Sequence, residues 1–397
     1  KNGVIHGEGR NSRIASFWLE GPAAAYQTWA QLTYKLLTAE HEFEMTGSEE
    51  TLKAVTNTDW GLPYLPRSAL EQRRSDELME RREETEKRTV PYGCRFLLAA
   101  VDVQGGRNRR FVVQIVGYGE NSERWLIDRY NIKSSMRSNS EGESLPIDPS
   151  AYPEDWDLLI SDVLNKQYRI EGLDGGFMPI LAMAVDSGGE DGVTDNAYKF
   201  WRRCKRDGIS KRVYLVKGDS TKRQKLISRT YPDNTSRSDR HAKARGDVPL
   251  YLLQTDQLKD RISNALSRET IGANYIHFPS WLGEWFFDEL TYEERGQDGK
   301  WRKPGKGNNE AFDLFCYTHA IAILRGYERI KWGDEDNVPY WAKLPGLNPD
   351  VIRKETTAPE EETESAVEIE QVKPQPKAKT KSNWLNGGVS KKKGGWL

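Results

Sequence analysis

Two apolar stretches of this chain each stop at a single aspartate. The first, FLLAAVDVQ at 96–104, carries Asp102 near its end, and the second, MPILAMAVD at 178–186, ends in Asp186. Apolar runs of this length, followed by glycines, are typical of buried strands. A single aspartate at the end of a strand usually begins a turn, so each acid needs partners before it indicates a function.

The order of elements around these stretches predicts a mixed sheet. Three β-rich runs separated by short polar loops lie at 94–106, 109–119 and 124–132. Loops this short join antiparallel neighbours. Segments that alternate helix and strand follow at 153–168, 178–186, 195–208 and 212–218. Such alternation implies parallel strands joined by crossover helices. A three-strand meander followed by this half is the strand order of the ribonuclease H-like α/β fold, a mixed sheet flanked by helices.

Composition divides the chain into three regions. Residues 1–95 are predicted to form a helical segment or linker. Residues 96–328 are predicted to form the folded domain, whose last element is a long helix at 308–329. Residues 329–397 predict a flexible charged tail, because an acidic run at 355–371 is followed by seven lysines and no acid. The chain starts without methionine, as a piece of a longer protein would.

Several classes of protein are disfavoured. The 59 basic and 60 acidic residues balance, so nucleic-acid binding requires local segregation of charge. Three widely separated cysteines predict neither a disulfide framework nor a zinc site. No apolar stretch of about 18 residues occurs, so a soluble intracellular protein without a membrane partner is expected. No GxxxxGK[ST] loop, HExxH motif or serine nucleophile elbow is present.

The two strand-end aspartates gain partners once the elements are ordered. Side chains at the ends of adjacent strands converge in an open α/β sheet, so Asp102 and Asp186 are expected to lie close together. Asp313, in the first turn of the last helix, and Glu310, three residues earlier, share one helix face. Hard oxygen ligands without a His or Cys cluster suit Mg²⁺ or Mn²⁺. Two such ions about 4 Å apart hydrolyse phosphodiesters, so metal-dependent cleavage of DNA is predicted. Asp128 is ambiguous, since it also suits pairing with a neighbouring arginine.

A basic segment follows the second acidic strand. Between Trp201 and Leu250 there are 15 Lys and Arg residues against 5 Asp and Glu residues, enough for a phosphate-binding surface. An exposed basic loop without a partner is the alternative interpretation. The residues predicted to contact DNA are Lys217, Lys222, Arg223, Lys225, Arg240 and Lys243.

These motifs, in this order, resemble the nuclease domain of lambda-type (GpA-like) phage terminase large subunits. The resemblance rests on FLLAAVDVQ, ERWLIDR, AVDSGG, VYLVKGDST, NYIHFP and NNEAFDLFCYTHAIAIL, and covers roughly residues 95–326. The segment SRIASFWLEGPAAAYQTWAQL also resembles the stretch that closes the ATPase domain of that family. Residues 1–95 are therefore expected to link an ATPase domain of the full-length protein to the nuclease.

The resemblance implies a packaging motor that cuts concatemeric double-stranded viral DNA in the host cell cytoplasm, transiently on the procapsid. Its implied partners are viral DNA, a small terminase subunit and a portal protein, the last contacted by the C-terminal tail. Asp102, Asp186 and Asp313 correspond to the metal-binding acids, and Glu310 is a further candidate. Gln104 stands where a two-metal scheme would use another acid, so Asp128 or Glu190 would have to fill that place.

Two other functions remain open from the sequence. The chain is alternatively a DNA-binding and portal-docking module without nuclease activity, in keeping with its basic segment and charged tail. A ribonuclease H-like transposase or resolvase would share the acids but act on branched or transposon-end DNA.

Overall fold

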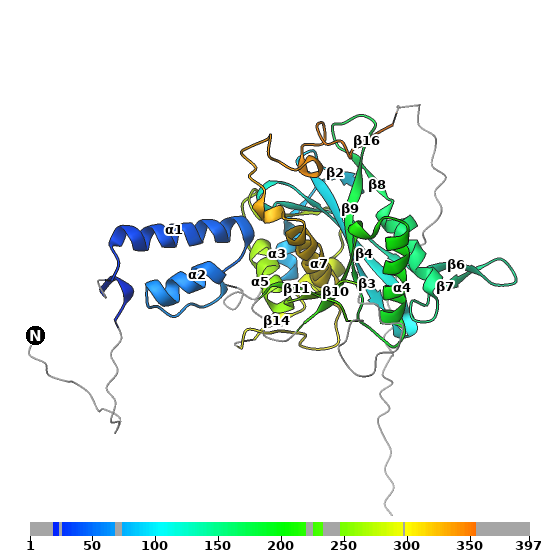
Figure 1. Ribbon diagram of the computed structural model, residues 1–397, viewed down its shortest axis with the longest axis horizontal. Helices are drawn as coiled ribbons and strands as arrows, with labels where there is room; N and C mark the ends of the chain where they lie inside the picture. The colour runs from blue at the N-terminus through cyan, green and yellow to red at the C-terminus, as the bar shows by residue number, and fades with distance from the viewer. Residues whose placement is uncertain are drawn as a thin grey trace, which may run out of the picture. The chain divides into compact units, whose positions relative to one another are not determined.

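A computed structural model describes residues 19–23, 26–67, 74–219, 225–232, 247–296 and 298–354. Its N-terminal part contains α1 (Trp29–Thr46) and α2 (Glu50–Ala54), which lie beside one another (Figure 1). Thr28 and Gln31 form a capping box at the start of α1, and Gly47 in a left-handed conformation ends it. Ala39, Phe43, Leu52 and Val55 form a small core between these helices.

The expectation that residues 1–95 are helical is wrong for the last part of that segment. After the short helix α3 (Ser75–Glu80) the chain forms β1 (Arg82–Glu83) and β2 (Thr89–Val90). The charged run around α3 has few apolar residues for a longer helix to bury, whereas the backbone of β1 gains hydrogen bonds by pairing with β13 (Ile276–Pro279). This segment therefore extends the sheet.

The central sheet confirms the predicted mixed topology. Its main path runs β1-β13-β5-β4-β3-β9-β10-β12-β11. The bounds of the strands not given above are Phe96–Gln104 for β3, Arg110–Tyr118 for β4, Arg124–Ile132 for β5, Gly176–Asp186 for β9, Val213–Gly218 for β10, Ile227–Thr230 for β11 and Leu250–Leu253 for β12. Strands β3, β4 and β5 form the antiparallel meander, and β3, β9, β10 and β12 are parallel. The expected ribonuclease H-like order is present.

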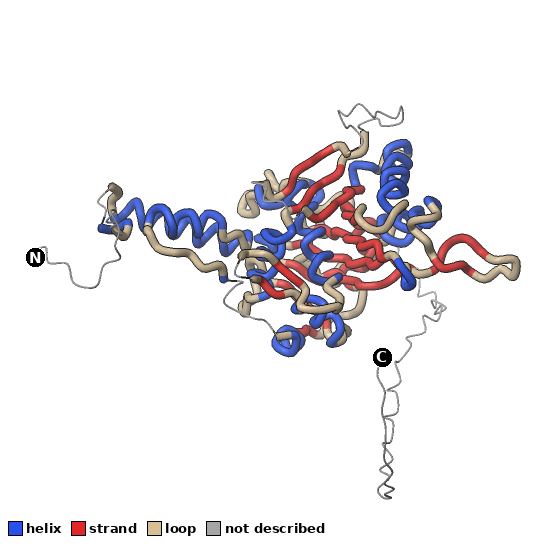
Figure 2. Tube along the Cα trace, turned by 90° about the horizontal axis from the view of Figure 1, so that it is seen from below, coloured by secondary structure: helices blue, strands red, loops and turns tan. Residues whose placement is uncertain are grey.

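Helices cover both faces of this sheet. On one side lie α5 (Thr255–Leu266), α6 (Glu284–Thr291) and α7 (Glu310–Leu324), and on the other lies α4 (Val193–Arg206), with the strands gathered between them (Figures 1 and 2). Alternate strand residues face the two layers. Leu98 and Ala100 of β3 pack on the α7 side, whereas Leu97, Ala99 and Val101 pack on the α4 side.

The helix expected at 153–168 is replaced by shorter elements. The chain forms a 3₁₀ turn at Pro153–Asp157, a π-helical turn at Ile160–Leu164 and the strand β8 (Gln167–Ile170). Trp156 is fully buried against Phe111 and Phe200. Packing of this aromatic side chain and the pairing of β8 with β9 take precedence over a continuous helix.

Residues 330–353 also pack against the domain, although a flexible tail was expected from residue 329. Strand β16 (Ile352–Arg353) pairs with the start of β9. Trp341 meets the Phe96 ring edge-on, with the ring centroids 5.0 Å apart. Val338, Trp341 and Ala342 supply apolar surface that a composition average hides. The rest of the expected tail, 355–397, lies outside the described residues.

Cys94, Cys204 and Cys316 are free and buried. Among the described helices, none combines the length and apolar character needed to span a bilayer.

Candidate functional site

The two strand-end aspartates lie at neighbouring positions of the sheet. Val101 of β3 pairs with Val185 of β9, and Asp102 and Asp186 are the next residues of each strand. Asp102 has the same parity as Leu98 and Ala100, so it faces the α7 layer, and Asp186 does so by the same parity on β9. Both side chains are half-buried.

The electrostatics show that the predicted acids share one environment. Burial raises the pKa of Asp102 to about 7, and the negative charge of Asp186 adds to this, with smaller contributions from Asp313 and Glu310. Burial likewise raises the pKa of Asp186, and Asp313 contributes to that shift too. Asp102 and Asp186 lie side by side on paired strands, and Asp186 accepts the hydroxyl of Tyr317, one turn after Asp313 on α7, so these acids lie on one side of the sheet.

Neutral groups hold the two strand-end carboxylates. The Gln104 amide donates a hydrogen bond to Asp102 Oδ2. The Gly188 backbone N–H donates to Asp186 Oδ1 at 2.8 Å, and the Tyr317 hydroxyl donates to Asp186 Oδ2 at 3.3 Å. Gly189, one residue further on, has φ of 138°, a conformation that favours glycine. The glycines thus let the chain turn directly beneath Asp186.

The two acids of α7 are paired with cations. Asp313 Oδ1 lies 2.8 Å from the Lys259 ammonium, and the Asn309 amide donates to Asp313 Oδ2 at 2.7 Å. Glu310 Oε1 lies 3.2 Å from the Arg110 guanidinium. Glu310 is 5% exposed, and its other oxygen, Oε2, has no hydrogen-bond partner among the described residues. A buried carboxylate oxygen without a donor is costly unless a cation approaches it.

Further charged side chains of this cluster were not anticipated from the sequence. Lys259 of α5 lies 2.5 Å from Glu293, which follows α6, and Arg129 of β5 lies 2.9 Å from Glu289 of α6. Burial disfavours the charged form of Lys259, but the charges of Asp313 and Glu293 outweigh burial and raise its pKa. Glu289 also accepts the Ala311 backbone N–H at the start of α7. Glu289 lies within α6 but Glu293 lies two residues beyond its end, so helical spacing in the sequence does not place the two acids together.

Comparisons with known proteins identify the family. Residues 14–332 match the model of the family described as terminase large subunit gpA, endonuclease domain. This chain belongs to that family.

A curated relative, the terminase large subunit of Escherichia phage lambda, is 27% identical over 316 residues, which are 76% of this chain and 42% of that protein. The chain therefore spans less than half the length of this relative. A solved structure, the large terminase of a thermophilic bacteriophage, is similar at 13% identity with a TM-score of 0.33, covering 76% of this chain and 54% of that one.

Asp128 of this terminase domain does not join the acid cluster. It lies opposite Ile115 in the β4–β5 pairing, and Ile115 belongs to the core on the α4 side of the sheet. The carboxylate of Asp128 lies 3.2 Å from Arg88 and 3.8 Å from Lys166, and it accepts a hydrogen bond from the Tyr168 hydroxyl. Asp128 is therefore an ion-paired residue of the opposite layer.

Glu190 lies nearer the strand ends, on the loop after Asp186. It accepts the Gly106 backbone N–H and the Arg109 guanidinium, each at 3.4 Å. These contacts tie the loop after β3 to the loop after β9. Gln104 stands where a two-metal scheme would use another acid. Glu190, one of the residues considered for that role, lies on the neighbouring loop and is exposed.

The oxygen donors present are of the type that binds a hard divalent cation. Within the described residues no group of three or more His, Cys, Asp or Glu side chains is placed so that it could hold a metal ion. Asp102 and Asp186, with the unpartnered Glu310 Oε2 in the same cluster, nevertheless provide carboxylate oxygens whose mutual repulsion a cation would relieve. Mg²⁺ or Mn²⁺ suits this donor set better than zinc does.

The predicted DNA-contacting residues are described only in part. Lys217 and Lys225 are exposed. Lys217, at the end of β10, is close enough for its charge to oppose slightly the raised pKa of Asp186. Lys222, Arg223, Arg240 and Lys243 lie outside the described residues.

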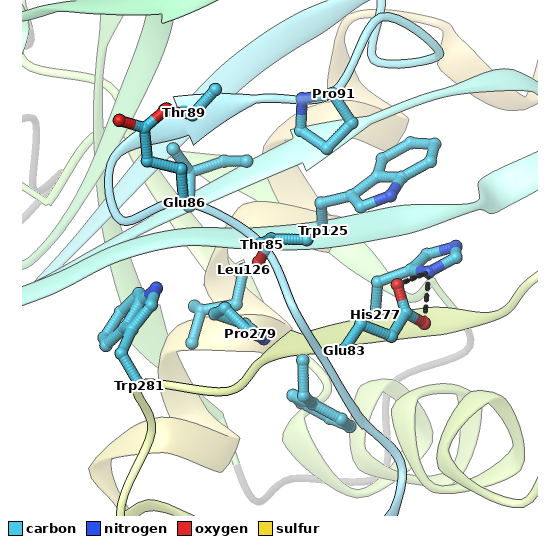
Figure 3. A pocket seen from close by; sticks show the side chains of 12 residues that line it. Glu83, Thr85, Glu86, Thr89, Pro91, Trp125, Leu126, His277, Pro279 and Trp281 are labelled. Atoms are coloured by element: carbon cyan, nitrogen blue, oxygen red, sulfur yellow. Dashed lines mark hydrogen bonds and ion pairs between the residues drawn. The ribbon is translucent and has the colours of Figure 1, made fainter. Parts of the chain in front are cut away.

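A separate pocket beside β13, next to the edge strand β1, is too small to be the site. It is lined by Glu83, Trp125 and His277 among others (Figure 3) and encloses about 10 Å³, room for about one water. The two ring nitrogens of His277 contact Glu83 at 2.8 Å and Glu123 at 2.9 Å. Its ring stacks on Trp125 with the centroids 4.8 Å apart. These contacts join β1, β13 and β5.

Proposed function

We propose that this chain is the metal-dependent endonuclease part of a viral DNA-packaging terminase and cuts double-stranded DNA by phosphodiester hydrolysis. The observation that carries the proposal is the side-by-side placement of Asp102 and Asp186 at the ends of the paired strands β3 and β9, facing α7. The raised pKa of Asp102, caused by burial and by the nearby acids, supports it. Perturbed acids gathered at the ends of parallel strands mark functional sites. Family membership supplies the reaction class.

In this proposal Asp102 and Asp186 hold Mg²⁺ or Mn²⁺, and the buried Glu310 Oε2 is the additional oxygen donor. The ion would polarise the scissile phosphate and activate the attacking water. Gln104, Gly188 and Tyr317 orient the two aspartates through neutral hydrogen bonds, which leaves their negative charge for the ion. Exposed Lys217 and Lys225, with the basic segment around them, contact the DNA backbone in a sequence-independent way.

The wider setting of the activity is proposed from the family. The residues before β1 connect an ATPase domain of the full-length protein to the nuclease, whose sheet includes β1 and β2, and 355–397 supply the portal-contacting end. The DNA is concatemeric viral DNA, and the partners are a small terminase subunit and the portal in the host cell cytoplasm. This chain covers 42% of the lambda relative, so that protein is long enough to contain further domains as well.

A cleavage assay tests the proposal. Purified chain is incubated with supercoiled plasmid in Mn²⁺, Mg²⁺ or EDTA, beside Asp186→Asn and the control Asp191→Asn, an exposed acid of the following loop. Metal-dependent nicking by the wild type and the control, and its loss in Asp186→Asn, is expected. Salt-sensitive DNA binding without cleavage in any metal would instead favour the DNA-binding and portal-docking module.

A further inference from the structure

Lys259 is a cation enclosed among the acids of the cluster. It projects from α5, is 7% exposed, and its ammonium lies 2.8 Å from Asp313 and 2.5 Å from Glu293. The same ammonium lies 5.6 Å from the centroid of the Phe312 ring. Because the side chain is enclosed by these three residues, its charge is held in a defined place.

The positively charged side chains of the cluster form ion pairs with some of its acids and not with others. Glu289 is paired with Arg129, and Glu310 with Arg110. Lys259 forms ion pairs with both Asp313 and Glu293. A fixed positive charge therefore accompanies each of these acids, which come from α6, α7 and the residues just after α6.

Asp102 and Asp186 differ from those acids. Their hydrogen bonds among the described residues come from the neutral groups of Gln104, Gly188 and Tyr317. Two adjacent carboxylates with neutral donors carry up to two negative charges when both are ionised, which one divalent cation balances. Arg129 and Lys217 act on this pair through longer-range electrostatics, and no ion pair among the described residues balances its charge.

Resting on the function proposed above, we propose that Lys259 is a positioning residue that takes the place of a second metal ion. The nuclease then binds one divalent ion, at Asp102 and Asp186, while the Lys259 ammonium holds Asp313 and supplies the positive charge on that side. A second ion at Asp313 would have to displace the ammonium from two carboxylates or lie beside it against charge repulsion. One bound ion then takes the place of the two ions expected from the sequence.

Counting bound ions tests the proposal without relying on activity. Mn²⁺ is titrated into the metal-free chain and followed by calorimetry and by the loss of the free-ion electron paramagnetic resonance signal. The wild type is expected to bind one ion per chain. Lys259→Met frees Asp313 and Glu293 and is expected to bind two, whereas Lys259→Arg restores one. Lys166→Met, which removes the lysine beside Asp128, is the matched control and keeps one.

A second variant keeps the test decisive if Lys259→Met does not fold. Asp313→Asn is expected to leave the count at one, with Mn²⁺ affinity changed less than about tenfold, and Asp186→Asn to abolish binding. Two ions in the wild type, falling to one in Asp313→Asn, would overturn the role of Lys259 while leaving the proposed nuclease intact. A folded wild type that binds no ion and cuts no DNA would overturn both.

Discussion

Asp102 and Asp128 project from opposite faces of the same sheet. Asp102 lies opposite Val112 of β4, which packs on the α7 side, and Asp128 lies opposite Ile115, which packs on the α4 side. Since successive strand residues alternate between faces, a carboxylate of one layer has no access to a ligand in the other. The two aspartates therefore have different consequences when replaced.

Asp128→Asn is expected to reduce stability and leave metal binding unchanged. The replacement leaves the Arg88 and Lys166 cations without their buried partner, which costs about 1–3 kcal/mol because both are partly exposed. Urea unfolding measures the loss, and Mn²⁺ titration of the folded variant measures affinity. An unchanged midpoint together with weakened Mn²⁺ binding would place Asp128 at the site after all.

Asp102→Asn is expected to stabilise the metal-free protein at alkaline pH. The pKa of Asp102 is raised from 3.8 to about 7 on folding, so its contribution to stability is fully present below about pH 4 and is lost as pH rises through 7. A neutral amide avoids that loss, by about 1–3 kcal/mol at pH 8. Thermal melts in EDTA at pH 5 and pH 8 measure the difference, which should be smaller at pH 5.

The exposed neighbour Asp191 provides the control for this experiment. Asp191→Asn should melt like the wild type at both pH values. If Asp102→Asn were less stable than the wild type at pH 8, the electrostatic strain at the strand ends would be refuted.

Truncation distinguishes the packed segment 330–353 from the residues beyond it. A chain that ends at residue 328 loses the Trp341 contact with Phe96 and the buried Val338 and Ala342, at a cost of at least about 3 kcal/mol. Denaturant unfolding of chains that end at 328 and at 354 compares the two boundaries. Equal stability of the two chains would show that the domain ends before this segment.

The sequence predicted much of the fold because its strands carry strong local signals. The apolar runs that end at Asp102 and Asp186, with short loops in the meander and helices between later strands, determine the mixed sheet. The same runs predict that the two acids lie together, because neighbouring parallel strands end at the same edge of a sheet. Segments with weak periodicity do not reveal their structure in this way. The pairing of β1 with β13, for example, depends on residues almost 200 positions apart.

The parts of the site that were missed depend on tertiary packing. Lys259 and Glu289 come from α5 and α6, Glu293 follows α6, and the way these helices cross the sheet has no short-range signature. The face taken by Asp128 depends on the β4–β5 register, which shifts at a bulge between Ile115 and Val116. One displaced residue reverses the side to which every later side chain points.

The most direct test of the central claim is the position of bound Mn²⁺ in crystals of this chain, located by anomalous scattering. The account predicts a strong peak between the carboxylates of Asp102 and Asp186, absent in crystals of Asp186→Asn. Peaks confined to other places, such as Asp128 or the exposed Glu190, in a protein that cleaves DNA would contradict it.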